Sequence, residues 1–442
     1  MTAPNPTAIP HHSAVIVGGG QAGLSLSHYL QQRSIEHVVF EKHRAMHVWQ
    51  DKRWDQFCLV TPNWQCKLPG WEYRGADPHG FMKKDEIVQY LAGFKAAVDA
   101  PLREGVAVQR VSARPQGGFT VQTQTGSGAD AVTHTCSANQ VIVASGGYHV
   151  PIIPRLAERL PASITQLHSE QYRNAAALPP GKVLVVGAGQ SGAQIAEDLH
   201  LAGREVVLAV GDAPRCARFY RGRDVVDWLA DMGYYDMPVE QHPLREGVRD
   251  NTNHYVTGRD GGRDIDLRAF AQQGMQLYGV LTDMQDGVLR FRPGLAASLD
   301  FADRTYNGIN ASIDQFIARS ALDAPPGAVY QPVWQPAAER TELALEGSGI
   351  TAVIWCIGYT PDFGWLDAPV FNGRGQPSHQ RGITQVAGLY FLGLPWLHSW
   401  GSGRFSGVAR DALHLAEQIE ALHLQQQGVA ATPQRDAATA LT

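Results

Sequence analysis

Two stretches of the sequence share one pattern, KVLVVGAGQSGAQIAEDL at Lys182–Leu199 and AVIVGGGQAGLSLSHYL at Ala14–Leu30. Each begins with a run of β-branched and other apolar residues, passes through a cluster of glycines and ends in a helical pattern. A strand, a glycine turn and a helix in this order are typical of a βαβ unit that binds a dinucleotide. The sequence therefore predicts two dinucleotide-binding turns on one chain.

The first turn reads GGGQAG over residues 18–23. In such a turn the first glycine permits a sharp bend, the second lets the backbone approach a pyrophosphate, and the third lets the helix pack against the strand. The N–H groups at the start of the helix then hold the phosphate charge. The following strand, HVVFE, ends in a carboxylate that can bind ribose hydroxyls. The alternative is a glycine turn used only for packing. The expected contacts are Gly18, Gly20, Gln21, Ala22, Gly23 and Glu41.

The second turn reads GAGQSG over residues 187–192. The strand after it runs into Asp212, and an acid there favours a free ribose 2′-hydroxyl and hence NADH. Three arginines nearby in the sequence, Arg204, Arg215 and Arg218, favour the 2′-phosphate of NADPH instead. The sequence leaves this choice open. The expected contacts are Gly187, Gly189, Gln190, Ser191, Gly192, Asp212 and Arg215.

Composition narrows the function classes. A chain of 442 residues favours two or three domains, and a net charge of −5 without a long basic run argues against a nucleic-acid partner. The N-terminus lacks a signal pattern, and no apolar run reaches the ~18–20 residues that span a bilayer, so we expect a soluble, cytoplasmic protein without a membrane partner. We expect no metal site, and a homodimer is left open. The cysteines at 58, 66, 136, 216 and 356 form no C-x-x-C pair, which suits a reducing compartment and argues against a dithiol reductase.

Hydrophobic periodicity and turn residues predict the elements along the chain. The predicted helices cover Gln21–Gln31, Lys84–Ala100, Asp224–Met232, Ile309–Arg319 and Gly407–Leu422. The predicted strands cover Ala14–Gly18, His37–Glu41, Val106–Val111, Phe119–Thr125, His134–Cys136, Gln140–Ala144, Lys182–Val186, Glu205–Val210, Ile350–Ile357 and Leu389–Leu394.

This order predicts an α/β fold with two Rossmann-like dinucleotide-binding domains, each a three-layer ββα arrangement, the second inserted into the first. The predicted segments are a disordered N-terminus at 1–12, a first domain at 13–165 and 325–424, a second domain at 166–324 with a helical and polar insert at 215–320, and a mobile tail at 425–442.

Two dinucleotide sites on one chain have an economical explanation. A nicotinamide at one site passes a hydride to a group held permanently at the other. A flavin suits that role because it accepts a hydride and can then react with oxygen. We therefore expect FAD at the first turn and NADPH or NADH at the second.

Further segments carry a resemblance to a known group of enzymes. With the two turns, they resemble class B flavoprotein monooxygenases over nearly the whole chain. Within that group, the chain is most similar to a bacterial family of flavin-dependent oxidoreductases whose genes often lie beside nitrilase-like genes. It departs from the group at Ala162 and Ile164, where Phe-x-Gly is usual, and at Gly211, where a basic residue is usual. The segments are WQDKRWDQFCLVTPNWQ at 49–65, VIVASGGYHVPIIP at 141–154, LHSEQYR at 167–173, WCIGYTPDFGWL at 355–366, and GLYFLGL and SGRFSGVARDA between 388 and 412.

The resemblance implies further cofactor contacts. Residues 49–65 resemble the segment that covers the flavin ring, and Asn63 lies where many members have an amide beside the reactive flavin carbon. Such an amide can hydrogen-bond a flavin peroxide, whereas the alternative for Asn63 is a turn residue after Pro62. Val108 lies where a backbone amide commonly meets adenine, and its alternative is a plain strand valine. The implied FAD contacts are Lys42, Trp49, Arg53, Trp54, Thr61, Val108, Ala144, Ser145, Gly146, Phe405 and Ser406, and those with the nicotinamide dinucleotide are Cys356, Ile357 and Gly358.

Residues 395–405, PWLHSWGSGRF, are a candidate substrate site near the flavin end of the C-terminal strand. We prefer a pocket here to the alternative of an aromatic surface loop. Segments 219–229 and 254–267 hold many Arg and Asp residues, which we interpret as salt-bridge networks. His168 and Cys356 are expected to be structural. The pocket candidates are Trp396, His398, Trp400 and Arg404.

The resemblance implies a monooxygenase that uses FAD and NAD(P)H. It would oxygenate a small organic substrate at a nitrogen, a sulfur or a carbonyl carbon, with O₂ and a C4a-(hydro)peroxyflavin, and without a protein nucleophile. A second hypothesis is a flavin-dependent oxidoreductase, such as an amine or imine oxidase or reductase, that inserts no oxygen. A third is a non-catalytic, nucleotide-sensing regulator.

Overall fold

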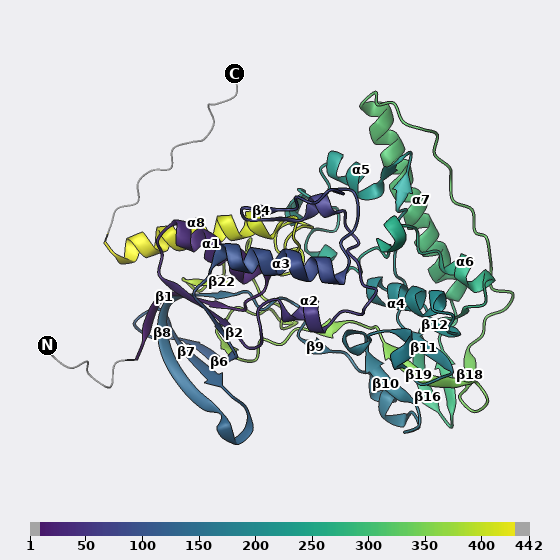
Figure 1. Ribbon diagram of the computed structural model, residues 1–442, viewed down its shortest axis with the longest axis horizontal. Coiled ribbons are helices and arrows are strands. Elements are labelled where there is room, and N and C mark those ends of the chain that lie inside the picture. The colour runs from purple at the N-terminus through teal and green to yellow at the C-terminus, as the bar shows by residue number, and fades with distance from the viewer. Residues whose placement is uncertain (1–8, 429–442) are drawn as a thin grey trace.

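The computed structural model describes residues 9–428, in which two large β-sheets lie side by side with helices packed on them (Figure 1). The first sheet has eight strands in the order β21-β6-β7-β8-β1-β2-β5, and β22 also pairs with β8. Its strands are β1 (His11–Val17), β2 (His37–Glu41), β5 (Leu102–Glu104), β6 (Val106–Ala113), β7 (Phe119–Thr125), β8 (Val132–Val143), β21 (Leu366–Asp367) and β22 (Leu389–Phe391).

The long strand β8 gives the first sheet its mixed character. Its first half pairs antiparallel with β7, and its second half lies between β1 and β22, parallel to both. The centre of β1 is buried on both faces, as its continuous apolar run predicts. One face is covered by the three helices α1 (Gln21–Gln32), α3 (Lys84–Val98) and α8 (Val408–Gln426), whose apolar residues form one core with it.

The second sheet has five strands, all parallel, in the order β10-β19-β11-β12-β15. Helices α4, α6 and α7 supply apolar side chains to the core on one face, and β16, β17 and residues 155–159 supply those on the other. The elements are β10 (Thr165–His168), β11 (Lys182–Val186), β12 (Val206–Ala209), β15 (Gln276–Tyr278), β16 (Leu281–Gln285), β17 (Val288–Phe291), β18 (Glu342–Ala344), β19 (Ile350–Trp355), α4 (Gln190–Leu201), α6 (Leu267–Gln272) and α7 (Leu295–Arg319).

The chain crosses between the two sheets twice, and the crossings are paired. Strand β9 (Val150–Pro151) follows β8, and β20 (Tyr359–Thr360) follows β19, and the two form an antiparallel pair. Among residues 9–428, no helix is long and apolar enough to cross a membrane. The remaining elements are α2 (His47–Asp51), α5 (Val225–Asp231), and the strand pairs β3 (Lys67–Leu68) with β4 (Trp71–Glu72) and β13 (Phe219–Tyr220) with β14 (Arg223–Asp224).

The mixed α/β fold predicted from the sequence is confirmed, with differences at the boundaries. Strand Ile350–Trp355 pairs with β10 and β11, so it lies in the second sheet and not in the predicted first-domain segment 325–424. The predicted insert at 215–320 contains β15, which completes that sheet. Both errors arise because strand pairing joins residues that are far apart in the sequence.

Other predicted boundaries also move. The two predicted strands at 134–136 and 140–144 are one continuous strand, β8. The helix predicted to begin at Ile309 begins at Leu295, because polar residues on its outer face obscure the first turns. His11 and His12 already belong to β1, and α8 continues to Gln426. The rest of the predicted disordered N-terminus and mobile tail, 1–8 and 429–442, lies outside the described residues.

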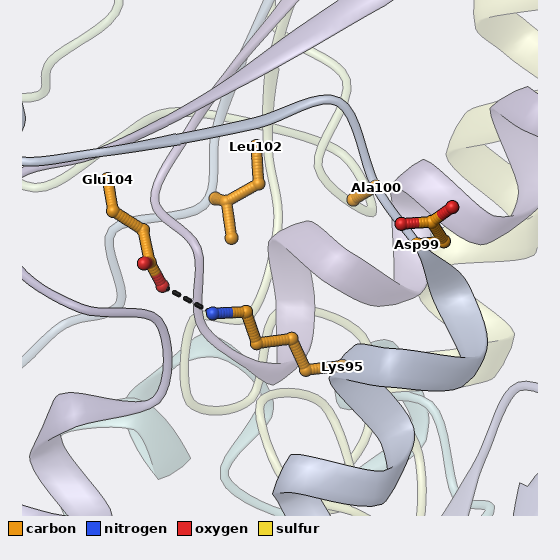
Figure 2. Close-up of a pocket in the computed structure, with 5 residues that line it drawn as sticks. All are labelled: Lys95, Asp99, Ala100, Leu102 and Glu104. Carbon is orange, nitrogen blue, oxygen red and sulfur yellow. Dashed lines mark hydrogen bonds and ion pairs between the residues drawn. The ribbon is translucent and has the colours of Figure 1, made fainter.

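Two cavities lie along α3. One, of about 250 Å³, is crossed by an ion pair of 2.6 Å between Lys95 Nζ and Glu104 Oε1, with Leu102 beside it (Figure 2). The other, of about 210 Å³, also includes Lys95 and Glu104 and extends to Trp49. Neither is lined by a glycine of the two turns.

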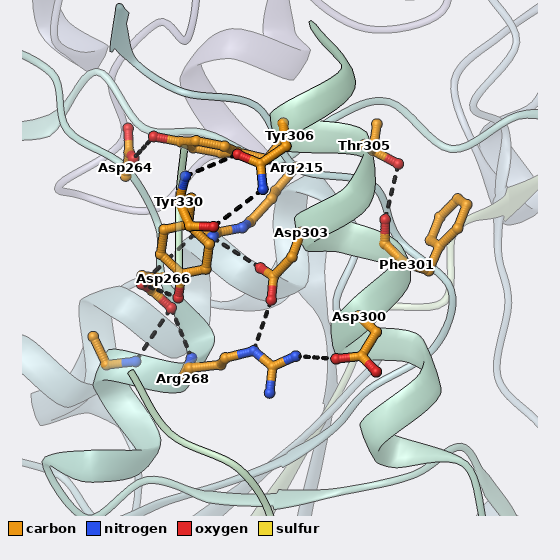
Figure 3. A network of polar contacts seen from close by, with 12 residues as sticks. Arg215, Asp264, Asp266, Arg268, Asp300, Phe301, Asp303, Thr305, Tyr306 and Tyr330 are labelled. Atoms are coloured by element: carbon orange, nitrogen blue, oxygen red, sulfur yellow. Dashed lines mark hydrogen bonds and ion pairs between the residues drawn. The ribbon is translucent and has the colours of Figure 1, made fainter. Parts of the chain in front are cut away.

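A buried ionic network joins α6, α7 and the segment that follows β12 (Figure 3). Arg268 Nε donates to Asp303 Oδ2 at 2.8 Å, and Arg215 Nη2 lies 2.8 Å from Asp303 Oδ1. The rings of Tyr306 and Tyr330 flank the Arg215 guanidinium, with centroids at 4.5 and 4.0 Å from its Cζ. The Asp303 carboxylate is therefore the shared counter-charge of two buried cations, as the salt-bridge interpretation predicts.

We expect Asp303→Ala to lower the free energy of unfolding by about 3–5 kcal/mol, because it leaves two buried guanidiniums without their shared carboxylate. The matched control is Asp300→Ala. Asp300 also accepts from Arg268, at 2.6 Å, but its side chain is 44% exposed, so its loss should cost about 1 kcal/mol or less. Urea denaturation followed by tryptophan fluorescence measures both, and equal losses would contradict the role of Asp303.

Candidate functional site

The first glycine turn combines two close backbone contacts with one open position. Gly18 has φ +114°, and a Cβ there would lie 2.6 Å from the Ala144 carbonyl oxygen at the end of β8. A Cβ at Gly23 would lie 2.0 Å from the Gly18 oxygen. Gly20, the N-cap of α1, has no atom within 4 Å of such a Cβ. Because Gly20 faces open space at a helix N-terminus, the turn has room for a phosphate and is not explained by packing alone.

Glu41 is fixed beside this turn. Its Oε2 accepts the Gly19 N–H and its Oε1 accepts the His43 N–H, both at 2.8 Å. The carboxylate is thus held at the carboxyl end of β2, next to Lys42, where the sequence predicts a ribose contact. Each oxygen keeps acceptor capacity for a hydroxyl.

The second turn repeats the geometry of the first. Gly187 has φ +102°, and its Cβ would lie 2.6 Å from the Cys356 carbonyl oxygen at the end of β19. A Cβ at Gly192 would lie 1.8 Å from the Gly187 oxygen. Gln190 Nε2 donates to the Val256 carbonyl at 2.8 Å, so the side chain of the turn also ties down residues 254–257. The two turns therefore share two close backbone contacts, but they differ at one glycine, since a Cβ at Gly189 would lie 3.3 Å from Thr252 Cγ2 whereas Gly20 is open.

Residues 356–358, which follow β19 beside the second turn, lie among buried groups. His168 Nε2 lies 3.1 Å from the Gly358 carbonyl oxygen, directly after Ile357, and burial lowers the pKa of His168. Burial also raises the pKa of the Cys356 thiol well above its usual range. The contact of His168 and the burial of the Cys356 thiol both fit the structural roles predicted for these residues.

The arginines that favour NADPH in the sequence are engaged elsewhere. Arg204 donates to the backbone carbonyls of residues 175, 179 and 181. Arg218 pairs with Asp224 at 2.5 Å, and Arg215 lies in the network of Asp303 with 2% of its side chain exposed. The guanidinium of Arg215 is therefore enclosed by its own partners, which disfavours the predicted contact with the dinucleotide, and that contact stays a prediction.

Asp212 also has a hydrogen-bond partner, but it lies directly after β12, where the sequence predicts the acid that binds the ribose. Its Oδ1 accepts from Ser298 Oγ of α7 at 2.7 Å, directly beyond β12. Asp212 is therefore the charged group at the position where a ribose 2′-substituent is expected, whereas Arg204, Arg215 and Arg218 have partners elsewhere in the protein.

Three of the predicted flavin-site residues meet in space. Trp49 Nε1 donates to Gln21 Oε1 at 3.4 Å, and Gln21 Nε2 donates to the Gly403 carbonyl at 3.1 Å. The rings of Trp49 and Phe405 lie 5.0 Å apart. The hydroxyl of Ser406 is buried and has no hydrogen-bond partner among the described residues, which suits contact with a bound group. Segment 49–65 and the residues at the start of α8 are therefore adjacent.

Other predicted flavin contacts are placed differently. Trp54 belongs to the core of the second sheet, 6.5 Å from the ring of Tyr172, and is not beside the first turn. Val108 lies at an irregularity in the pairing of β6 with β7, half-buried. Thr61 is half-buried beside Pro62. The contacts of Val108 and Thr61 with FAD stay predictions.

Asn63 has the structural role that the sequence analysis gives as its alternative. It is 4% exposed, its Oδ1 accepts the Met82 N–H at 2.7 Å, and its Nδ2 donates to the Asp77 carbonyl at 2.9 Å. Its own N–H donates to the Gly80 carbonyl. These bonds fix loop 77–82 and favour the structural role, and the bond to a flavin peroxide stays a prediction.

The four substrate-pocket candidates divide into two pairs. Trp396 is buried in a small core with Val239 and Val248, and the His398 carbonyl accepts the Val239 N–H at 2.6 Å. These two residues therefore anchor segment 234–253, and their place in a substrate pocket stays a prediction. Trp400 and Arg404 form a cation–π pair, with Arg404 Cζ 3.9 Å from the ring centroid.

The structure brings two residues to this pair that the sequence analysis missed, and it places a third missed residue, Tyr148, against Tyr359. Asn253 Oδ1 accepts from Arg404 Nη2 at 2.9 Å, and the ring of Tyr235 lies 4.5 Å from that of Trp400. Tyr148, in the crossing after β8, lies 5.6 Å from Tyr359 in the crossing after β19. Only Tyr148 had a signal in the sequence, since it lies in the segment 141–154 that resembles class B flavoprotein monooxygenases.

Comparisons with known proteins agree with this geometry. The model of the pyridine nucleotide-disulphide oxidoreductase family matches residues 15–229. An oxidoreductase named CzcO-like from Geobacillus kaustophilus is 30% identical over 411 residues, which are 92% of this chain and 97% of that protein. This chain belongs to the CzcO-like oxidoreductase family.

Members of wider groups are similar to this CzcO-like oxidoreductase. The indole-3-pyruvate monooxygenase YUCCA4 of rice is 27% identical over 195 residues, 42% of this chain and 44% of that protein. A mutant form of a flavin monooxygenase from Stenotrophomonas maltophilia has the same fold, with a TM-score of 0.61, 19% identity, and coverage of 94% of this chain and 99% of that chain. The predictions of an oxidoreductase enzyme and of a likeness to flavoprotein monooxygenases are confirmed, and the predicted cofactors, FAD with NADPH or NADH, agree with these comparisons.

Glu197 on α4 is a buried acid that the sequence analysis missed. It is 2% exposed, and its Oε1 lies 3.3 Å from Arg263 Nε. Burial raises the pKa of Glu197 to about 7, against the opposing effect of Arg263. Because α4 starts at the second turn, this group links the turn to loop 257–263.

The stability of the protein should therefore depend on pH through Glu197. Between the ordinary pKa and about 7 the unfolded chain loses this proton while the folded protein keeps it, so stability falls as pH rises through that window, by up to about 3 kcal/mol from this group. Glu197→Gln should flatten that part of the profile, as measured by urea denaturation from pH 4.5 to 8. An unchanged slope would contradict the raised pKa.

Proposed function

We propose that this chain is an FAD-dependent monooxygenase that uses NADPH or NADH and O₂ to oxygenate a small organic substrate. FAD binds at the turn 18–23 on the first sheet, and the nicotinamide dinucleotide binds at the turn 187–192 on the second. The second domain is inserted into the first, since its strands follow β8 and precede β21 in the chain.

The residues at the first turn fit the proposed FAD. The N-terminus of α1 and the open position at Gly20 would take the pyrophosphate, and Glu41 the ribose. Trp49 and Phe405 would cover the ring system, with the Ser406 hydroxyl as a free polar group beside it. Burial of these groups supports a site for a large, partly apolar cofactor.

The proposed chemistry belongs to the cofactors: a flavin accepts a hydride from a nicotinamide and, once reduced, reacts with O₂. The chain positions the two dinucleotides and excludes water. The pairing of β9 with β20 supports this, because it joins the segments that follow β8 and β19. Each glycine turn packs against the carbonyl after one of these two strands, so the pairing also links the two turns. The duplicated turn geometry is the observation that carries the proposal.

Oxygen insertion is favoured over dithiol chemistry. The family that matches residues 15–229 is named for disulphide reduction, but the five cysteines are free and four of them are buried. Burial also raises the pKa of the Cys58 thiol to about 11 and of Cys66 to about 12, which leaves little thiolate to react near neutral pH. The matched monooxygenase from rice supports oxygenation.

Gly20→Ala should separate cofactor binding from folding. No atom obstructs the added methyl group and the backbone is extended, so the unfolding free energy should fall by about 1 kcal/mol or less, because alanine is a poorer N-cap than glycine. The methyl group would stand where the pyrophosphate approaches, so FAD affinity should fall about tenfold or more. Equilibrium dialysis with FAD measures this.

The control is Gly308→Ala, a second glycine whose Cβ would meet no atom, here inside α7 and far in sequence from either turn. It should leave FAD affinity unchanged. A Gly20→Ala protein that binds FAD like the wild type would exclude the proposed cofactor site.

Stoichiometry should distinguish a monooxygenase from the other hypotheses. With its substrate present, the protein should consume NAD(P)H and O₂ in equal amounts, form one oxygenated product and one water, and release little H₂O₂. Small amines, nitriles and ketones with NADH or NADPH form the test panel. Oxidase activity would appear as H₂O₂, reductase activity as turnover without O₂, and a regulator would bind both dinucleotides without turnover.

A further inference from the structure

Two guanidiniums beside the proposed flavin site have no carboxylate partner within residues 9–428. Arg404 donates to the Trp400 carbonyl and to Asn253 Oδ1, both neutral acceptors. Arg53 donates to the Lys52 carbonyl at 3.1 Å. The fully buried arginines of the second domain differ, since Arg215 and Arg268 share Asp303.

The surroundings of both cations are aromatic. The Cζ of Arg53 lies 5.2 Å from the Trp49 ring centroid and 5.4 Å from that of Phe57, and Arg404 lies over Trp400. Burial lowers the pKa of both arginines. Both side chains are half-buried, and a charge partly removed from water is costly unless an opposite charge accompanies it.

The two arginines border one region. Arg404 adjoins Phe405, whose ring contacts Trp49, four residues before Arg53. The electrostatic effect of Tyr148 on both guanidiniums opposes this lowering of their pKa. Glu170 is the carboxylate that acts on Arg53, but it is paired with Lys52 at 2.9 Å. The region therefore holds two positive charges, aromatic walls and no free carboxylate of its own among the residues described.

We propose that Arg53 and Arg404 bind the carboxylate of the substrate, so that the protein acts on small organic acids. This inference rests on the proposed function and names its substrate class. Guanidinium groups bind carboxylates through paired N–H donors, and the aromatic rings offer contact to the rest of an organic acid. The pyrophosphate of FAD already has the N-terminus of α1, so it does not need these two cations.

Benzoate and benzamide test the charge requirement, because they have nearly the same shape and differ in charge. With the FAD-loaded full chain, titrations followed by flavin absorbance should show benzoate binding at least tenfold tighter than benzamide. Arg404→Met and Arg53→Met should each weaken benzoate about tenfold or more and leave benzamide unchanged, while the Lys variants keep part of the affinity. Arg110→Met, at an exposed ion pair with Asp367, is the control and should change neither.

FAD content and affinity for NADH and NADPH are measured on the same variants. Tighter benzoate binding that depends on both arginines, with FAD content and nucleotide affinity retained, supports the proposal. Equal binding of the two probes, or loss of FAD or nucleotide affinity instead of benzoate affinity, overturns it. If the chain takes up no FAD, the proposed function fails, and tryptophan fluorescence still shows whether the two arginines select an anion.

Discussion

The structure depends on the contact between each glycine turn and the carbonyl that ends a neighbouring parallel strand. At Gly18 and at Gly187 a Cβ would stand 2.6 Å from such an oxygen, at Ala144 and Cys356. No side chain can be accommodated at that distance, and the positive φ of both residues adds a second reason for glycine. This contact brings the start of a helix to the edge of the sheet, where its free N–H groups can receive a phosphate.

The same contact places the two sites relative to each other. Ala144 and Cys356 end the two strands after which the chain leaves one sheet for the other, and the paired strands β9 and β20 hold the two crossings together. The insertion of one nucleotide unit into the other thus gives two connections where a simple tandem arrangement has one. Two connections restrict the relative motion of the turns more than one would, which suits a hydride transfer between two bound cofactors.

Charge is distributed differently in the two halves of the molecule. Around Arg215, Arg218 and Arg268 each guanidinium has a buried or half-buried aspartate, so these arginines stabilise the loops and helices that follow β12. Around the start of α8, Arg404 has only an amide and a carbonyl. The first group has its counter-charges within the protein, whereas Arg404 has none among residues 9–428, and this difference is the basis of the proposal that Arg404 binds an anion.

Much of the fold could be predicted because its signals are local. The apolar run, the glycine spacing and the following helix all lie within about twenty residues, and local sterics decide them. Buried strands such as His37–Glu41 and Lys182–Val186 were located for the same reason. Cofactor type followed from the repetition of the turn, which is also visible in the sequence alone.

The sequence by itself therefore determined the two nucleotide turns, the α/β class and the kinship with flavin oxidoreductases. Only the tertiary structure decided which side chains are free to act. Asn63 and Arg215 have residue types that suit a site, but their partners, Met82 and Asp303, come from other segments and occupy them. Phe405 and Trp49 became neighbours although they are far apart in the sequence, and Gln21 joins Trp49 to the Gly403 carbonyl. The availability of a polar group depends on contacts between distant segments, and no local pattern records those contacts.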